Sequence, residues 1–434
     1  MARAIRALPF VGVAFVVLVL AKLHAEFIGE YDLTGSGRFL WTAAYVGLSC
    51  LIAYGLGIPD QEDPGDAIRS SLIAALAAPL GFGLLQLAAG EALIPRSVIA
   101  FSAPCYFGLF VATGAARRRS RGTEAGAAAL LAVLDDAEAS EFAADMDGPL
   151  ERAAAVRAIK RPTDFAKAGD LQQALASAGA TLLVLGRAGL DNSVLLADAA
   201  RLHAEGLRVR GVFAFYEEWV GKIPHRQLGQ AALMFDIAEV HRPGYRRSSR
   251  LLDVVFALLA LAPLALVTPI VLIGNLFGNS GPLFYRQTRV GRNGTEFEML
   301  KFRSMQTGEA EGEWTKTDDD RITRFGGILR TSHVDELPQV LNILKGDLSV
   351  VGPRPEQPRY VALLEEKIPF YQLRHLVRPG LTGWAQVNYP YGADERDALE
   401  KLQYEFWYLR HQSLVLDLRI IVRTLRHVLG FRGR

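Results

Sequence analysis

The strongest constraint on this chain comes from its long apolar stretches, which occupy much of the first quarter of the sequence. A helix needs roughly 20 residues to cross the hydrocarbon of a bilayer, and each of four stretches approaches that length. Because lipid offers no partner to an open amide or carbonyl group, such a stretch is stable there as a helix. The sequence therefore predicts four transmembrane helices within residues 1–121, at residues 8–21, 39–58, 70–89 and 97–113.

The first stretch also has the length of the apolar core of a signal peptide. Lys22 and His24 follow it, however, where small residues would mark a cleavage site, and three further apolar stretches come after it. We therefore favour a helix that is retained in the membrane over a cleaved signal peptide.

Basic residues near the helix ends predict the orientation of this region. Arg3 and Arg6 precede the first helix, and four arginines between residues 117 and 121 follow the fourth. Lysine and arginine collect on the cytoplasmic side, so both ends of the region are expected in the cytoplasm. The acidic segment at residues 60–66 adds little, because acidic residues carry little weight in this rule.

Composition excludes one class of partner. The formal net charge is only +2, so the chain lacks the global basic field that nucleic-acid binding requires. Half of the residues are hydrophobic, as expected for a membrane part beside one or two soluble parts. Cys50 and Cys105 both fall in apolar stretches, where we expect small buried side chains and no disulfide.

Residues 122–245 have a different rhythm, in which short apolar runs alternate with alanine-rich helical runs. This pattern predicts a Rossmann-like α/β domain with a parallel sheet. The first run leads into Asp135, Asp136 and Glu138 instead of a glycine-rich turn, so we expect a structural or regulatory role and no dinucleotide. The expected strands are residues 128–134, 181–185 and 209–215, and the expected helices are residues 170–177 and 193–204.

A fifth apolar stretch, residues 254–285, contains no charged residue but includes Pro263 and Pro269. A full crossing would carry all that follows, including a dense basic segment, to the outer side. Proline kinks a helix, and the hydroxyl of Thr268 is a local donor for a carbonyl that proline leaves open. The sequence therefore predicts a re-entrant helix at about residues 251–277, with a proline-bent crossing helix as the alternative.

The remainder of the sequence is polar and carries short clusters of charged residues, glycine and proline between apolar segments. Their order along the chain is the informative feature. The clusters are Gly281-Pro-Leu-Phe-Tyr-Arg-Gln-Thr-Arg-Val-Gly-Arg292, Lys301-Phe-Arg-Ser-Met305, Arg321-Ile-Thr-Arg324, Leu329-Arg330, Asp335-Glu-Leu-Pro-Gln339, Leu344-Lys-Gly-Asp347, Val351-Gly-Pro-Arg-Pro-Glu356 and Arg378-Pro-Gly-Leu-Thr-Gly-Trp-Ala-Gln-Val-Asn388.

In order and spacing these clusters resemble the bacterial sugar transferase domain of monotopic phosphoglycosyl transferases. The resemblance runs from about Arg250 to the C-terminus, and the regions before it resemble those of the larger exopolysaccharide-initiating members. It implies a mainly helical α+β catalytic domain at residues 246–434 that opens with the re-entrant helix.

Two features of the sequence depart from the family pattern. The kink proline of the family usually follows a serine, whereas here the candidates are Ala262-Pro263 and Thr268-Pro269. The position of the kink is therefore open between the two prolines. His333-Val334 just before the acidic pair is the second departure, and we expect it to be tolerated.

The acidic pair Asp335-Glu336 is predicted to open a helix. Thr331 and Ser332 before it are helix-capping types, and Pro338 fits only the first turn of a helix. A helix start offers free amides and a positive dipole end, which favour bound phosphate and an ionised carboxylate. Alone, such a pair more often only satisfies the helix dipole, but the complete set of ordered clusters favours catalysis, in which an ionised aspartate attacks phosphorus.

The resemblance implies the chemistry. Asp335 would attack the β-phosphate of a UDP-sugar, release UMP and pass the sugar phosphate to polyprenyl phosphate. Glu336 would bind Mg²⁺ and assist the acceptor. The lipid bilayer is a further partner, the protein is expected in the bacterial inner membrane with its catalytic domain on the cytoplasmic face, and a homodimer is left open. The substrate-binding candidates are Lys301, Arg303, Arg330, Arg354, Arg378 and Gln386.

Two other classes of function stay in view. A glycosyltransferase would move the sugar without its phosphate and release UDP instead of UMP. A catalytically silent scaffold or membrane sensor would turn over no donor. Separately, residues 404–427 mix aromatic, aliphatic and basic side chains, which fits a helix in the membrane interface and ordinary core packing equally well.

Overall fold

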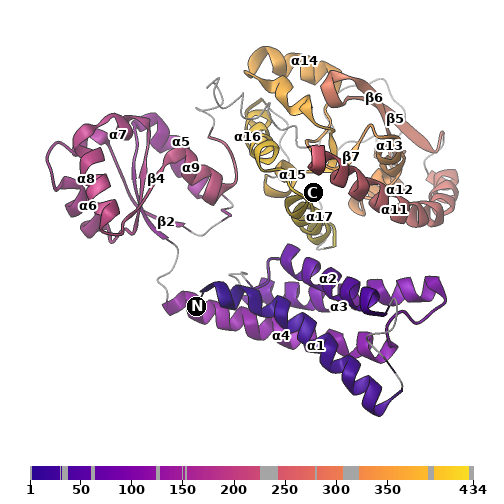
Figure 1. Ribbon diagram of the computed structural model, residues 1–434. Helices are drawn as coiled ribbons and strands as arrows, with labels where there is room; N and C mark the ends of the chain where they lie inside the picture. Colours follow the sequence, from indigo (N-terminus) through magenta and orange to yellow (C-terminus); the bar gives the residue numbers. More distant parts are fainter. Residues whose placement is uncertain are drawn as a thin grey trace. The chain divides into compact units, whose positions relative to one another are not determined.

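A computed structural model describes residues 2–29, 31, 38–59, 64–123, 128–148, 150–151, 154–224, 243–278, 281–305, 322–389 and 395–429 (Figure 1). The chain forms two compact units. One comprises Met1–Gly126 with Ile421–Arg426, and the other comprises Ala127–Ile420 with His427–Arg434.

The first unit is a bundle of four helices, as predicted. α1 (Ala2–Phe27) packs against α2 (Arg38–Gly55) and α4 (Arg96–Thr123), and α3 (Pro64–Ala89) packs against the same two helices. Val13 and Val17 of α1 are completely buried in this bundle, which is the packing expected of a retained helix.

Small and aromatic side chains fill the bundle centre. Ala74 and Ala78 of α3 are fully buried, and small residues of this kind let helices approach closely where no water drives them together. The hydroxyl groups of Tyr45 and Ser102 bond to each other, so these polar atoms satisfy one another inside the apolar core. Cys50 is half-buried, but Cys105 is exposed, so the expectation of burial is wrong for Cys105.

Among the described residues, four helices are long and apolar enough to cross a membrane, and this places the protein in the membrane. Three belong to the bundle, at Ala7–Phe27, Ala67–Leu87 and Arg96–Arg117, and the fourth lies in the second unit at Gly244–Leu276. The remaining bundle helix, α2, has 18 residues and is not among them. The four predicted helices of the bundle are therefore present. Three of them have the length and composition of a membrane-spanning helix among the described residues.

The second unit begins with a four-stranded parallel sheet, which confirms the prediction of a small parallel-sheet domain. Its strands are β1 (Ala128–Val133), β2 (Ala154–Lys160), β3 (Leu182–Leu185) and β4 (Arg208–Gly211), in the order β2-β1-β3-β4. β2 is absent from the sequence expectation because it is an edge strand with charged residues and no continuous apolar run. The third expected strand is wrong in its second half, because Val212–Phe215 forms the helix α9.

Alternation along β1 divides the core of this domain in two. Leu130 and Ala132 pack with Phe142 of α5 (Asp136–Met146), whereas Leu131 and Val133 pack on the opposite face. Successive strand residues point to opposite faces, so a strand that is apolar throughout needs helices on both. Figure 1 shows α5 and α9 on one side of the sheet, and α6 (Asp170–Ala178), α7 (Arg187–Asp191) and α8 (Ser193–Ala204) on the other.

Carboxylates fill the turn after β1. Asp135 Oδ1 accepts hydrogen bonds from the amides of Ala137 at 3.0 Å and Glu138 at 2.7 Å, and so caps α5. Glu138 Oε1 in turn accepts a bond of 3.2 Å from the amide of Arg187. These side chains hold the helix start from which a dinucleotide-binding turn would approach pyrophosphate. The arrangement supports a structural role for the turn, and the lack of dinucleotide binding stays a prediction.

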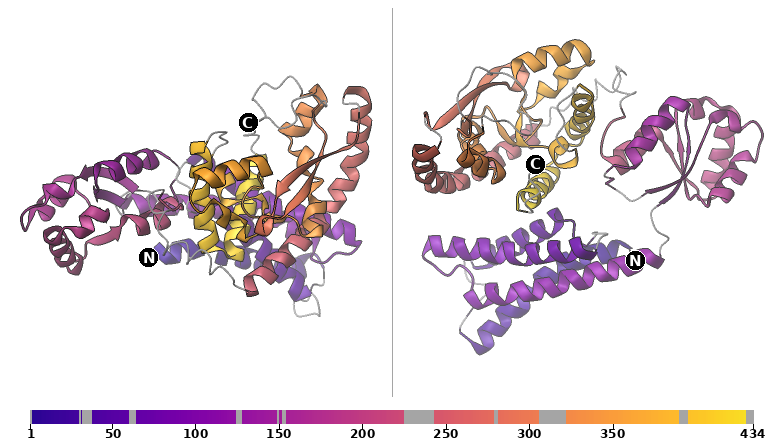
Figure 2. Two further views of the ribbon diagram at one scale, coloured as in Figure 1. Left: turned by 90° about the horizontal axis from the view of Figure 1, so that it is seen from above. Right: turned by 180° about the vertical axis from the view of Figure 1, so that it is seen from behind.

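The C-terminal region combines two short sheets with helices, and Figure 2 shows it from two further sides. β5 (Phe284–Val290) and β6 (Glu296–Phe302) form an antiparallel pair, and β7 (Ser349–Val351) pairs in parallel with β8 (Gly380–Thr382). Its helices are α11 (Pro243–Gly278), α12 (Arg324–Thr331), α13 (Gln339–Lys345), α14 (Pro358–Lys367), α15 (Trp384–Asn388), α16 (Glu395–His411) and α17 (Leu414–Leu429).

Two polar residues attach the beginning of α11 to this region. Arg250 donates hydrogen bonds of 2.6 Å and 2.7 Å to the carbonyls of Ile343 and Leu344 at the end of α13. A cation at this position satisfies open carbonyls and the negative end of the helix dipole. Asp253 Oδ1 accepts bonds of 2.8 Å from the hydroxyl of Ser349 and from the amide of Val350 on β7.

The second half of α11 packs on the same region. Leu264 and Val271 share a core with Phe302 and Leu329, and the ring of Phe325 lies against Gly274 so closely that a Cβ there would overlap it. The face of α11 that these contacts leave uncovered is strongly apolar. Its exposed side chains include Leu251, Val255, Leu258, Leu259, Leu266, Ile270, Leu272, Ile273 and Leu276.

Thr268 acts differently from the expectation. Its hydroxyl donates a bond of 2.6 Å to the carbonyl of Leu264. Pro269 lacks the amide that would bond four residues back, so the carbonyl that it leaves open is that of Ala265. The hydroxyl therefore serves the neighbouring carbonyl instead of the one that proline frees.

The sheet domain and the C-terminal region meet along α16. Lys222, of which 2% is exposed, forms ion pairs with Asp145 of α5 at 2.6 Å and with Glu400 of α16. The indole Nε1 of buried Trp384 donates a bond of 2.7 Å to the carbonyl of Gly221. Ile223 is fully buried in the core that α16 shares with α14. The segment at residues 221–223, which follows the sheet domain, is therefore part of the folded C-terminal region.

Core packing is the correct interpretation for the first part of residues 404–427. Phe406 and Leu409 of α16 are buried in that core, and Tyr404 and Tyr408 are buried beside them. α17 differs, because it buries Leu416 and Ile420 but exposes Leu414, Val415 and Leu425.

We predict that Lys222→Ala destabilises the protein by about 3 kcal/mol, because it leaves two carboxylates in a protein interface without their cation. Thermal and denaturant unfolding in detergent measure this loss. Lys367→Ala is the matched control, since it removes a lysine from an exposed pair with Glu395 and should change stability by less than about 1 kcal/mol. Equal effects of the two substitutions would show that the Lys222 contact does not hold the interface.

Candidate active site

The acidic pair lies in the connection between α12 and α13. α12 ends at Thr331, His333 takes a left-handed conformation with φ of 56°, and Val334–Glu336 form a single 3₁₀ turn before α13. The prediction that the acidic pair opens a helix capped by Thr331 and Ser332 is wrong, because the pair lies in the 3₁₀ turn and α13 begins only at Gln339. Ser332 instead donates a 2.8 Å bond back to the carbonyl of Ile328, because a hydroxyl can serve a helix end as well as a helix start.

Asp335 is buried, with 8% of its surface exposed. Burial raises the pKa of Asp335 above its ordinary value, although the positive charges of Lys301 and Arg330 oppose the change. The adjacent carboxylate of Glu336 adds to the increase. Asp335 is therefore poorly hydrated and lies within the field of two cations.

Glu336 is held by cations. Lys301 Nζ donates a bond of 2.9 Å to Glu336 Oε1, and Arg354 Nη2 lies 4.0 Å from the same oxygen. Burial alone would raise the pKa of Glu336, but these charges outweigh it and lower this pKa to about 2. The pair therefore contains one carboxylate with a raised pKa and one with a depressed pKa.

Asn342 fixes Lys301 relative to the acidic pair. Its side-chain oxygen accepts a bond of 3.0 Å from the amide of Leu300, and its side-chain nitrogen donates one of 2.7 Å to the carbonyl of Glu298. Asn342, which lies on α13, thereby bonds to two backbone groups at the edge of β6. Lys301 on β6 and Glu336 before α13 are thus set at a constant separation.

The Gly352-Pro-Arg-Pro355 turn presents Arg354 on a rigid backbone. The amide of Gly352 bonds to the carbonyl of Thr382 at 2.9 Å, and that of Gly380 bonds to the carbonyl of Pro353 at 2.8 Å. A Cβ at Gly352 or Gly380 would overlap the opposite backbone, so both positions require glycine for this close approach.

A buried ion pair supports this turn from behind. Arg374 Nε and Nη2 donate to the two carboxylate oxygens of Glu405 at 2.8 Å and 2.7 Å, and about 5% of either side chain is exposed. Nη2 of Arg374 also donates a bond of 2.8 Å to the carbonyl of Arg354. Sequence reasoning missed this pair, because no short motif joins two residues that lie 31 positions apart.

Arg289 is a second residue that sequence reasoning missed. Its guanidinium donates a bond of 2.9 Å to the carbonyl of Pro355 and lies 3.7 Å from Glu356. Burial lowers the pKa of Arg289, whereas Glu356 opposes that change. Arg289 stands in the first polar cluster of the sequence, so the available signal was its membership of that cluster.

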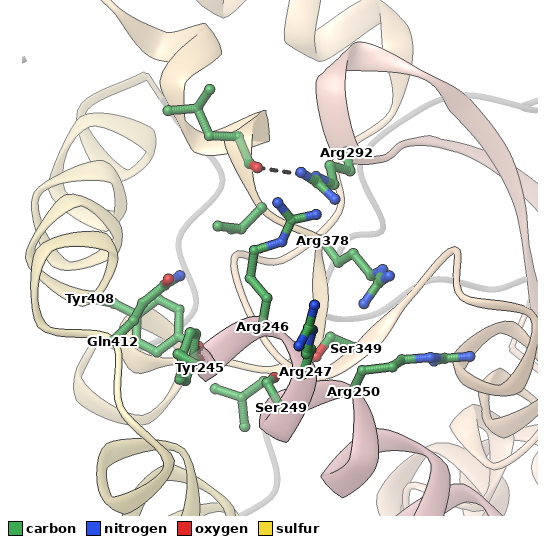
Figure 3. A pocket seen from close by; sticks show the side chains of 13 residues that line it. Tyr245, Arg246, Arg247, Ser249, Arg250, Arg292, Ser349, Arg378, Tyr408 and Gln412 are labelled. Carbon is green, nitrogen blue, oxygen red and sulfur yellow. Dashed lines mark hydrogen bonds between the residues drawn. The ribbon is translucent and has the colours of Figure 1, made fainter. Parts of the chain in front are cut away.

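The other predicted site residues have contacts outside the acidic pair. Arg330 acts on Asp335 through its charge and donates to the sulfur of Met305 at 3.4 Å. Arg303 packs its guanidinium against the backbone of Gly281, and Gln386 donates a bond of 3.2 Å to the carbonyl of Leu381. Arg378 lines a separate pocket together with Arg246, Arg247, Arg250 and Arg292 (Figure 3).

We predict that Lys301→Met raises the pKa of Glu336 and lowers the melting temperature at pH 7. The folded-state pKa of about 2 lies below the ordinary value of 4.5, so ionised Glu336 contributes stability above pH 4.5 that is lost as the pH falls toward 2. The difference in melting temperature between wild type and Lys301→Met should therefore narrow across that interval. Lys345→Met, which breaks an exposed pair with Asp347, should stay close to wild type, and a pH-independent difference for Lys301→Met would contradict the assignment.

Comparison with known proteins identifies the C-terminal region. A model of the family described as bacterial sugar transferase matches residues 244–431. The UDP-N-acetylgalactosamine-undecaprenyl-phosphate N-acetylgalactosaminephosphotransferase of Aeromonas hydrophila is 41% identical over 198 residues, which are 44% of this chain and 46% of the relative. The UDP-glucose:undecaprenyl-phosphate glucose-1-phosphate transferase of Xanthomonas campestris pv. campestris is 45% identical over 181 residues, or 41% of this chain and 37% of the relative.

The chain thus spans less than half of the length of these two relatives. A third relative, the exopolysaccharide production protein PSS of Rhizobium leguminosarum bv. phaseoli, is 39% identical over 191 residues, which are 42% of this chain and 92% of that protein. Nearly the whole of this relative is therefore matched by this chain. This chain belongs to the bacterial sugar transferase family.

Proposed function

We propose that this protein transfers a sugar 1-phosphate from a UDP-sugar to polyprenyl phosphate, giving a polyprenyl diphosphate sugar and UMP. The observation that carries this proposal is the buried Asp335 beside a carboxylate that Lys301 and Arg354 hold ionised. The names of relatives that act on UDP-sugars and undecaprenyl phosphate supply the substrate class. The name of the third relative supports a role in initiating exopolysaccharide synthesis.

The proposed reaction proceeds through Asp335 in two displacements. A carboxylate oxygen of Asp335 bonds to the β-phosphorus of the donor, and the phosphoanhydride bond to UMP breaks, so that UMP leaves with the electron pair. An oxygen of polyprenyl phosphate then bonds to the same phosphorus, and the acyl phosphate bond breaks. The carboxylate of Asp335 is restored, and each step exchanges one phosphorus–oxygen bond for another.

Cations of this chain lower the barrier to bringing anions together. Arg354 presents its guanidinium from a rigid turn, which suits bidentate contact with phosphate. Lys301 and Arg330 place further positive charge next to Asp335. Since phosphoryl transfer depends on positioning and electrostatic stabilisation, these fixed cations are the groups that we expect to orient the donor diphosphate.

Glu336 is the residue that we propose for Mg²⁺. Among the described residues no group of three or more histidine, cysteine, aspartate or glutamate side chains forms a metal cage. Magnesium is commonly held by one or two carboxylates together with substrate phosphates, so a single ionised glutamate fits this ion. When bound, Mg²⁺ would neutralise charge on the donor phosphates.

The packing of α11 supports a re-entrant arrangement. Arg250 near its beginning and Gly274 near its end contact the same folded region, so both ends of the apolar helix are bound to one domain. A helix that crossed the bilayer would place one of those contacts, with charged neighbours, on the far side. We therefore propose that α11 enters and leaves on the cytoplasmic face of the inner membrane, where a lipid phosphate and a water-soluble donor can meet.

We predict that Asp335→Asn abolishes turnover, because an amide keeps the size of the carboxylate but cannot form the acyl phosphate. Glu336→Gln should also be severe, and the double variant should be little worse than either, since losses within one catalytic unit are not additive. A UMP-release assay across a panel of UDP-sugars with polyprenyl phosphate measures turnover. Glu365→Gln on the exposed side of α14 is the matched control and should keep wild-type activity.

Rapid quenching with labelled UDP-sugar and no lipid acceptor tests the intermediate. Wild type should retain label that hydroxylamine releases, Glu336→Gln should acquire it slowly, and Asp335→Asn should acquire none. Release of UDP in place of UMP, or near wild-type turnover by Asp335→Asn, would overturn the proposed chemistry.

We predict that single cysteines at Ser248 and Arg286, on either side of the apolar part of α11, are both protected in intact cells. Cys50 and Cys105 are first replaced by alanine, and an impermeant maleimide is applied before and after permeabilisation. Gly29→Cys, between α1 and α2, should react in intact cells and serves as the external control. If Arg286→Cys reacts in intact cells while Ser248→Cys does not, α11 crosses the membrane and the proposed topology is wrong.

A further inference from the structure

A pocket rich in arginine lies at the beginning of α11, and of its lining residues Arg378 alone is among the substrate-binding candidates predicted from the sequence. The cavity measures about 510 Å³, within the range of pockets that hold small organic ligands. Figure 3 shows arginine side chains gathered around it. Its lining comprises Arg246, Arg247, Arg250, Arg292 and Arg378 together with Tyr245, Ser249, Ser349, Val351, Leu376, Val377, Tyr408 and Gln412.

Three separate parts of the chain supply these arginines. Three of them come from the first turns of α11, Arg292 from the turn between β5 and β6, and Arg378 from the segment before β8. Nε of Arg292 donates a bond of 3.3 Å to the carbonyl of Leu376, which fixes the guanidinium at the pocket wall. These five arginines do not form one basic run in the sequence. Folding brings them together from three separate segments.

The cations of this pocket repel one another. Burial lowers the pKa of Arg292, and Arg246 and Arg378 lower it further. Burial also lowers the pKa of Arg378, and Arg250 adds to this effect. Groups of like charge at close range destabilise a fold, so their collection in one cavity indicates that an anion compensates them.

The described acidic groups near the pocket offset little of this charge. Asp253 acts on Arg250 and Arg378 through its charge, and its Oδ1 accepts the bonds from Ser349 and Val350, whereas its buried Oδ2 accepts no hydrogen bond. Asp417 bonds to the two tyrosines that line the pocket. It accepts bonds from the hydroxyls of Tyr245 at 2.8 Å and Tyr408 at 2.9 Å. The described lining therefore holds five arginines and no carboxylate, and the charge of nearby Asp253 acts on two of them.

We propose that this pocket is a second anion site, which binds a phosphate or diphosphate group independently of Asp335. Guanidinium groups match phosphate oxygens in pairs, and several of them from different directions suit a multiply charged anion better than a single carboxylate. The aliphatic and aromatic parts of the lining offer contact area for an organic group attached to the phosphate.

The position of the pocket allows two sources for that phosphate. Its α11 arginines begin the candidate span Gly244–Leu276, and basic residues at such a point lie at the level of lipid phosphates. The pocket also adjoins the active site through β7. Ser349 at one end of this strand lines the pocket, and the strand leads at Gly352 into the turn that carries Arg354. A soluble diphosphate is therefore the other source.

Binding measurements on the full chain, in neutral detergent for the soluble probe and in nanodiscs for the lipid probe, test the proposal without any turnover. Every protein carries Arg354→Gln, which removes a cation from the Asp335 site and so reduces anion binding there. Inorganic pyrophosphate is the soluble probe, measured by calorimetry. Phosphatidic acid against phosphatidylcholine, in nanodiscs examined by native mass spectrometry, is the lipid probe.

At least one probe should bind, and Arg246→Gln with Arg292→Gln should weaken that binding at least tenfold. Arg359→Gln removes an exposed arginine on α14 and should leave it unchanged. Binding of pyrophosphate alone identifies a soluble ligand, and binding of phosphatidic acid alone identifies a lipid head group.

If the double variant fails to fold, Arg247→Gln, an exposed pocket residue, takes its place with the same expected direction. The proposal is overturned if neither probe binds, or if the pocket variants bind as tightly as Arg359→Gln. Loss of the covalent label in the Asp335 experiment would leave this result unaffected, so the two proposals fail separately.

Discussion

Arg250 and Asp253 join the beginning of a largely apolar helix to a folded domain. Arg250 donates hydrogen bonds to the last carbonyls of α13, and Asp253 accepts hydrogen bonds from β7. The two contacts fix the elements that flank the candidate active site, because α13 follows the acidic pair and β7 leads to the turn of Arg354. This helix is therefore part of the framework of the candidate active site, and a change in its first turns would alter the separation between the acidic pair and the turn of Arg354.

The rigidity of the site comes from contacts behind it. Asn342 holds β6 to α13, and the buried pair of Arg374 and Glu405 holds the carbonyl of Arg354. A buried pair of this kind adds little net stability compared with an apolar core, but removal of one partner is costly. Its value here is geometric, since the pair fixes the backbone from which Arg354 extends.

Sequence reasoning worked best where one local pattern decides the structure. The apolar stretches predicted the bundle helices and α11, and alternating apolar and helical runs predicted the parallel sheet. It failed where the same residue types serve two purposes, as when Thr331 and Ser332 end a helix instead of beginning one. It could not find β2, whose edge position removes the need for a continuous apolar run. The Arg374–Glu405 pair and the pocket around Arg378 were out of reach, because both depend on contacts between distant segments.

The apolar face of α11 has a consequence for how the protein is anchored. Nine large aliphatic side chains on this helix are 46–76% exposed, and complete burial of a fully exposed side chain of this kind gains roughly 1.5–3 kcal/mol. Such a surface holds its domain to lipid without help from the bundle. Attachment to the membrane is thus duplicated within one polypeptide. The relative from Rhizobium leguminosarum, of which 92% is matched by 42% of this chain, is a much shorter protein of the same family. The bundle is then not needed to attach the C-terminal region to the membrane. Its sequence can therefore change without loss of the enzyme from the bilayer.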